Sequence, residues 1–169
     1  NEAPKQVIVI DETGRMFKPL TQLNATRYLP ANTSQSIEQI RELIKLEIPF
    51  SMTPGVTSFS AAASSLNQEL TKPQIAQSIV LTRTEGRASK MPENETLENF
   101  AKSGAILAIH LSIHDIAKVV KKVKPFYNGS CPVKVVWKAS WPEEQIIHSD
   151  LSNIDIIRKT FVRFAVPLI

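Results

Sequence analysis

Two neighbouring segments decide the fold: TPGVTSFSAAA at residues 53–63 and LTRTEGR at residues 81–87. The first predicts a strand end that turns at its Pro-Gly pair and opens a helix of small residues, because glycine accepts backbone angles that other residues resist. The second predicts a strand that delivers Arg83 and Arg87 to one edge of a sheet. Ligands bind at that edge in α/β proteins, so these segments are the first candidates for a functional site.

Short apolar runs alternate with helical patterns along the rest of the chain. Strands are predicted at residues 6–10, 48–53, 77–82, 105–111, 133–137, 145–148 and 160–166, with a further short strand near 26–29. Helices are predicted at residues 36–47, 57–66, 95–102, 112–124 and 153–159. Ser112 and Asp115 offer N-cap chemistry to the fourth helix, and the turn DETG predicts a hairpin over residues 6–20. The alternation predicts an α/β fold, a layered mixed sheet with flanking helices.

Composition limits the classes of protein to consider. A chain of 169 residues, 43% of them hydrophobic, is long enough for one domain with a real core. No apolar run approaches the roughly 20 residues that span a bilayer, so no membrane partner is expected. The net charge of +4 comes from dispersed basic residues without interleaved aromatic residues, so nucleic acid is not expected as a partner either. The single Cys131 excludes an internal disulfide and predicts a cytoplasmic protein.

Thr57 and Ser58 follow the Pro-Gly turn at the start of a helix. Free backbone amides and two hydroxyls there suit a polar ligand, but a capped helix packed on a sheet has the same pattern and is commoner. Arg83 and Arg87 suit an anionic substrate, since arginine binds carboxylates through two parallel hydrogen bonds. The alternative is a solvated loop with a local ion pair to Glu85, and the pattern favours neither.

The other reactive side chains are scattered. A strand-to-helix junction separates His110 from His114, and without a third ligand nearby they predict core or capping histidines rather than a metal site. Trp141 is expected to cover the core rather than line a pocket. Cys131 has no neighbouring base, so a nucleophilic role is not expected.

Four blocks occur in a set order and with set gaps, at residues 53–63, 81–89, 107–114 and 138–144. Together they resemble the tetrapyrrole methylase family, and within it the C-terminal half of the branch that methylates precorrin-4 at C(11). The similarity runs from residue 36 to the C-terminus. It predicts a tetrapyrrole-methylase-like C-terminal lobe over residues 36–169 and a divergent N-terminal segment, a strand or hairpin, over residues 1–35.

The resemblance implies an S-adenosylmethionine-dependent methyltransferase of cobalamin biosynthesis that acts on a precorrin. The methyl group would pass to a ring carbon in one displacement, with no metal. Carried over by position, the residues expected to contact the cofactor are Thr57, Ser58, Leu111 and Leu151. Arg83 and Arg87 would lie near the carboxylates of the macrocycle, and no catalytic side chain is implied. The family tends to form dimers, so a homodimer is an open alternative.

The chain also departs from the family pattern. It has no Gly-x-Gly-Pro-Gly-Asp loop, and HSDL at residues 148–151 replaces an Arg-Gly-Thr-Leu pattern. It begins with Asn1, which predicts an excised piece or a processed product. Two hypotheses follow: a methyltransferase lobe whose other half lies elsewhere, or an inactive homologue that serves as a binding or assembly module. An unrelated basic domain fits the ordered blocks poorly. Weak or absent S-adenosylmethionine binding is expected for the chain alone.

Overall fold

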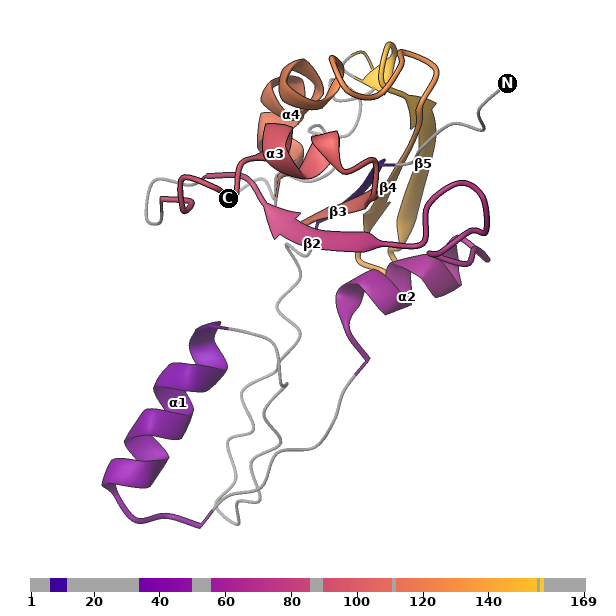
Figure 1. The fold of residues 1–169 in the computed structure, drawn as a ribbon. Coiled ribbons are helices and arrows are strands. Elements are labelled where there is room, and N and C mark those ends of the chain that lie inside the picture. The colour runs from indigo at the N-terminus through magenta and orange to yellow at the C-terminus, as the bar shows by residue number, and fades with distance from the viewer. Residues whose placement is uncertain are drawn as a thin grey trace.

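The structure is a computed structural model that describes residues 7–11, 34–49, 56–85, 90–110, 112–154 and 156. Its centre is a five-stranded sheet in the order β2-β3-β1-β4-β5 (Figure 1). The strands are β1 (Val7–Asp11), β2 (Ile79–Arg83), β3 (Ile106–His110), β4 (Pro132–Trp137) and β5 (Gln145–Asp150). The first four are parallel and β5 is antiparallel to β4. This confirms the predicted α/β fold with a mixed sheet.

The helices flank this sheet or lie apart from it. They are α1 (Ser34–Lys45), α2 (Ser58–Ser65), α3 (Leu97–Lys102), the 3-10 turn η1 (Ile113–Asp115) and α4 (Ile116–Val123). Figure 1 shows α3 and α4 on one face of the sheet, α2 on the other, and α1 away from the sheet. The predicted helices over residues 36–47, 57–66, 95–102 and 112–124 are therefore confirmed, with boundaries shifted by a few residues.

β1 lies between β3 and β4 in the middle of the sheet. Ile8 is in register with Ala108 of β3 and with Lys134 of β4, both in parallel strands. The hairpin predicted for residues 6–20 would give β1 an antiparallel neighbour, but its second half lies outside the described residues. The described partners are both distant in the chain, so the N-terminal segment contributes a strand to the same sheet as the rest.

The predicted strand at residues 48–53 is wrong where it can be seen, because Ile48 and Pro49 are not in a strand. The helix α1 ends instead in a closed turn. Glu47 has a positive φ of 51°, and the N–H of Ile48 donates to the carbonyl of Leu43 at 3.0 Å. This pattern satisfies the last carbonyls of a helix and directs the chain away from it. The predictions at 26–29 and 160–166, and most of the last helix, lie outside the described residues.

The sheet has an apolar core on each face. Alternate residues of a strand point to opposite faces, so Leu107 and Ile109 of β3 pack with α3 and α4, while Ile106 and Ala108 pack with Ala62 of α2. All of these side chains are buried. A parallel strand covered on both faces has a continuous apolar sequence, which explains the AILAI run at residues 105–109, just before His110.

Candidate functional site

The carboxyl ends of β2, β3 and β4 meet at one edge of the sheet because these strands are parallel to β1 or to each other. At this edge Arg83, the last residue of β2, is in register with His110, the last residue of β3. The loop after β4 starts at Lys138 on the same edge. Three of the sequence blocks therefore converge here, each at the end of a different strand.

The start of α2 joins this edge through Ser58. Its Oγ lies 3.4 Å from Nδ1 of His110. Thr57 precedes the helix with extended backbone angles, but its side chain makes no cap hydrogen bond; its Oγ1 lies 3.0 Å from Oγ of Ser60. As expected for a capped helix on a sheet, α2 has Thr57 at its N-cap and packs on the sheet through Ala62, but neither hydroxyl closes the first turn of the backbone. Ser58 reaches across to the neighbouring strand end instead.

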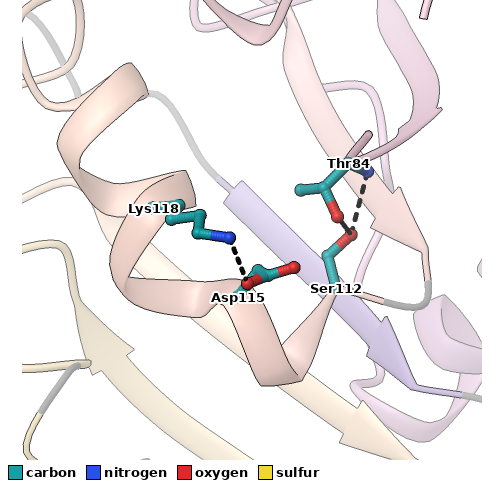
Figure 2. A network of polar contacts seen from close by, with 4 residues as sticks. All are labelled: Thr84, Ser112, Asp115 and Lys118. Atoms are coloured by element: carbon teal, nitrogen blue, oxygen red, sulfur yellow. Dashed lines mark hydrogen bonds and ion pairs between the residues drawn. The ribbon is translucent and has the colours of Figure 1, made fainter. Parts of the chain in front are cut away.

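A buried serine ties the ends of β2 and β3 together (Figure 2). Ser112 is 1% exposed, and its Oγ donates to the carbonyl oxygen of His110 at 2.6 Å. The Oγ of Ser112 also accepts from the backbone N–H of Thr84 at 3.1 Å and lies 2.9 Å from Oγ1 of Thr84. Ser112 and Asp115 occupy the predicted N-cap positions, of η1 and α4, but neither side chain makes a cap hydrogen bond. Asp115 pairs with Lys118 at 3.0 Å instead.

His110 lies half-buried on the face of β3 that packs against α2, two residues beyond Ala108. Burial lowers its pKa below the usual value for histidine, so the ring is neutral at neutral pH. The sequence interpretation as a core or capping histidine missed its contact with Ser58. The signal was present, because counting in twos from Ile106 places His110 on the face that meets the small-residue helix.

Arg83 is exposed, and within the described part of the chain it forms no ion pair. The predicted pair with Glu85 is therefore not seen. Leu81, on the same face of β2 as Arg83, is 50% exposed although it is apolar. An unpaired cation beside an exposed apolar side chain suits an anionic ligand with an apolar body.

The loop over residues 138–144 lies at the end of β4. Lys138 and Ser140 have positive φ angles of 50° and 65°, which non-glycine residues rarely adopt. Lys138 Nζ lies 4.6 Å from the ring centroid of Trp137 and 5.8 Å from that of Trp141. Trp141 is 38% exposed, so its predicted place over the core is wrong: the turn carries it outward.

The carboxylate of Glu144 anchors this loop to α2. Its Oε2 accepts from the hydroxyl of Ser65 at 2.7 Å and from the backbone N–H of Ser140. The helix α2 therefore contacts the sheet edge at both ends, through Ser58 at its start and Ser65 at its last residue. It spans the space between the ends of β3 and β4.

The remaining predicted site residues are not all brought to this edge. Leu111 and Arg87 lie outside the described residues. Leu151 is 2% exposed and belongs to the core on the α3–α4 face, opposite the face that carries Ser58. Asp150, the unusual acid before it, accepts from the backbone N–H groups of Ser152 and Asn153 at 2.8 and 2.9 Å. These hydrogen bonds, with one from the Asn153 side chain as the largest cause, lower the pKa of Asp150.

The described residues hold no cluster of three or more histidine, cysteine or carboxylate side chains that could bind a metal. Among the helices in those same ranges, none is both long and apolar enough to cross a membrane. Cys131 is buried in the core.

Comparison with known proteins identifies the family. Residues 30–155 match the Tetrapyrrole (Corrin/Porphyrin) Methylases. The chain is 55% identical over 117 residues to a precorrin-4 C(11)-methyltransferase of a Sinorhizobium species, which covers 69% of this chain and 46% of that protein. It is 42% identical over 134 residues to the precorrin-4 C(11)-methyltransferase of Pseudomonas aeruginosa, covering 78% of this chain and 53% of that one. The chain thus spans about half the length of these relatives.

Solved structures agree with the sequence match. The X-ray structure of a cobalt precorrin-4 methyltransferase, a cobalamin biosynthetic enzyme, superposes with a TM-score of 0.69 at 36% identity, over 75% of this chain and 53% of that one. A uroporphyrin-III C-methyl transferase from Thermus thermophilus complexed with S-adenyl homocysteine has the same fold, with a TM-score of 0.58 at 20% identity, over 83% of this chain and 55% of that one. The chain therefore belongs to the tetrapyrrole (corrin/porphyrin) methylase family.

Proposed function

We propose that this chain supplies one wall of the site at which a precorrin-4 C(11)-methyltransferase binds S-adenosylmethionine and its tetrapyrrole substrate. The names of the relatives that match it support this function. The observation that carries the proposal is the contact between Ser58 and His110. It joins the start of a helix to the strand end that is in register with Arg83, so two kinds of binding group face one place.

The start of α2 fits the polar part of the cofactor. No side-chain oxygen of Thr57 occupies the first-turn amides, and the helix dipole favours a carboxylate or hydroxyl there. Thr57 and Ser58 would hold S-adenosylmethionine, which supplies an electrophilic methyl group when bound. Leu111 and Leu151 remain proposed contacts from the family resemblance alone, and the buried position of Leu151 lends it no support.

The edge beside α2 fits the substrate. Arg83, and Arg87 by the resemblance, would bind carboxylates of the macrocycle, while Leu81 offers an apolar surface to its ring. The residues of this wall would act by holding donor and acceptor in line and by excluding water. We also propose that the protein is cytoplasmic. Light scattering on the purified chain would show whether it forms a homodimer.

A second candidate is an inactive homologue that serves as a binding or assembly module. The HSDL sequence at residues 148–151, which replaces the Arg-Gly-Thr-Leu pattern of the family, supports this candidate. Both functions predict binding of a carboxylated tetrapyrrole. They differ in the cofactor, because an inactive module would not need it.

Two titrations test these proposals. Absorbance titration with uroporphyrin, a carboxylated tetrapyrrole, should show binding that Arg83→Ala weakens roughly tenfold, the effect of losing one charge-assisted hydrogen-bonded contact. Calorimetry with S-adenosylmethionine and S-adenosylhomocysteine should show weak or absent binding by the chain alone. A micromolar dissociation constant would contradict the inactive module, and failure to bind uroporphyrin would contradict the proposed wall.

A further inference from the structure

His110 occupies the point where the parts of the proposed site meet. Its ring contacts Ser58 at the start of α2, its Cα is in register with Arg83, and its carbonyl accepts from Ser112. The backbone of this residue is therefore fixed by β2, and its ring by α2. The proposed function uses His110 only as the partner of Ser58 and gives its ring no ligand to bind.

The ring has one nitrogen left for a ligand. Nδ1 is 3.4 Å from Oγ of Ser58, and Nε2 has no partner among the described residues. The side chain is half-buried, so the ring is not sealed inside the core. If the Ser58 hydroxyl donates to Nδ1, the neutral ring carries its proton on Nε2 and can donate from there.

The neighbour of His110 supplies a fixed charge. Arg83 lies on the adjacent strand, about 5 Å away at the backbone as in any sheet, and its side chain leaves from the same face. It has no ion-pair partner in the described ranges, and Leu81 on the same face is 50% exposed. A cation and an imidazole side by side, with an apolar side chain next to the cation, match a carboxylate attached to a large apolar ring.

We propose that His110 and Arg83 together bind one carboxylate of the tetrapyrrole, with Ser58 holding the imidazole at Nδ1 so that Nε2 meets the carboxylate. This inference rests on the proposed function. Arg83 gives the permanent charge, and His110 gives a second, directional donor. Two donors from adjacent strands would fix the orientation of that carboxylate and, through it, of the ring.

The arrangement makes binding depend on pH. Burial lowers the pKa of free His110, whereas a bound carboxylate stabilises the charged imidazolium and raises it. Affinity should therefore increase as the pH falls toward the pKa of the histidine. Along the neighbouring chain the charged residues near His110 are Arg83, in register with it, and Glu85, two residues further on; α2 has none. His114, four residues after His110, is exposed and serves as the control histidine.

Uroporphyrin titrations of four proteins test the proposal at about pH 6 and about pH 8, on either side of the histidine range. The wild type should bind more tightly at the lower pH. His110→Phe should weaken binding about tenfold and abolish the pH dependence. His110→Gln keeps an N–H donor near the position of Nε2, so it should bind close to the wild type at high pH but without the increase at low pH. His114→Gln, the matched control, should behave as the wild type.

A neutral water-soluble porphyrin separates carboxylate recognition from a structural role. His110→Phe should leave its binding unchanged. An equal loss for both porphyrins, or a pH dependence that survives in His110→Gln, would overturn the inference. Thermal melts check folding; should His110→Phe not fold, His110→Asn replaces it, since its amide can meet Ser58 but cannot reach the position of Nε2. If Arg83→Ala loses uroporphyrin binding and the His110 variants do not, this role for His110 is overturned and the proposed function stands. If the wild type does not bind uroporphyrin, both are overturned.

Discussion

The change Ser112→Ala should destabilise the fold more than any exposed serine substitution. Ser112 is 1% exposed, and its hydroxyl joins the end of β3 to the residue that follows β2. Alanine removes the donor to the His110 carbonyl at 2.6 Å. It also removes the acceptor for the N–H of Thr84 at 3.1 Å and the contact with its Oγ1 at 2.9 Å.

The size of the effect follows from these contacts. One hydrogen bond contributes about 1 kcal/mol net, and a buried polar group left without a partner costs about 1–3 kcal/mol. With water excluded from Ser112, we expect the free energy of unfolding to fall by about 2–3 kcal/mol, a large share of the roughly 5–15 kcal/mol typical of a domain.

Urea denaturation followed by tryptophan fluorescence measures this difference, with Ser130→Ala as the matched control. Ser130 is exposed, and among the described residues its Oγ donates to Asn128 Oδ1 alone, at 2.7 Å, so its loss should cost less than about 0.5 kcal/mol. Equal midpoints and slopes for the two variants would refute the reasoning, because the buried network would then contribute nothing that an exposed serine does not.

Three further changes test the core and the turns. Tyr127→Phe should lower the free energy of unfolding by about 1 kcal/mol in chemical denaturation, because the buried hydroxyl donates to the Ala105 carbonyl at 2.6 Å. Burial also raises the pKa of Tyr127, so the wild type, but not this variant, should lose that contribution as pH rises above about 10, the pKa of unfolded tyrosine. Hydrogen bonds lower the pKa of Asp150 in the folded protein, so its carboxylate stabilises the fold above about pH 4, the pKa of an unfolded aspartate. This stabilisation is lost as the pH falls through the folded-state pKa. Asp150→Ala should therefore reduce the drop in melting temperature at acid pH. Leu107→Ala, at a side chain that is 0% exposed, should cost about 2–5 kcal/mol, whereas Leu46→Ala, at one that is 65% exposed, should be nearly neutral; similar midpoints would contradict the assigned core.

Much of the fold was predictable because local patterns encode it. The apolar run that ends at His110 predicts a strand covered on both faces, and β3 is such a strand. The small residues after Thr57 predict a helix that packs closely, and Ala62 is fully buried against the sheet. The end of α1 was misjudged, since Ile48 looks like a strand residue by type. Its N–H closes the helix instead, a choice made by backbone hydrogen bonding rather than by side-chain preference.

The candidate site was predictable only in part. Arg83 and Ser58 could be proposed from the sequence because charge and turn chemistry are local properties. The role of His110 could not, because its partner lies 52 residues away and the two meet only when α2 packs on β3. The role of Ser112 was also not predictable, because its hydroxyl could either cap a helix or bridge two strands. It bridges the strands because the ends of β2 and β3 lie side by side in the folded protein.

The family, the α/β class and the succession of most strands and helices along the chain could be predicted from residue patterns alone, because they depend on periodicity, capping residues and motif spacing. The place of β1 between β3 and β4, and the shared edge of Ser58, Arg83 and His110, follow from the folded arrangement. Strand pairing and side-chain contacts between distant segments depend on which apolar faces bury each other. Which faces pack together depends on segments far apart in the chain, so it cannot be predicted from any short stretch of residues.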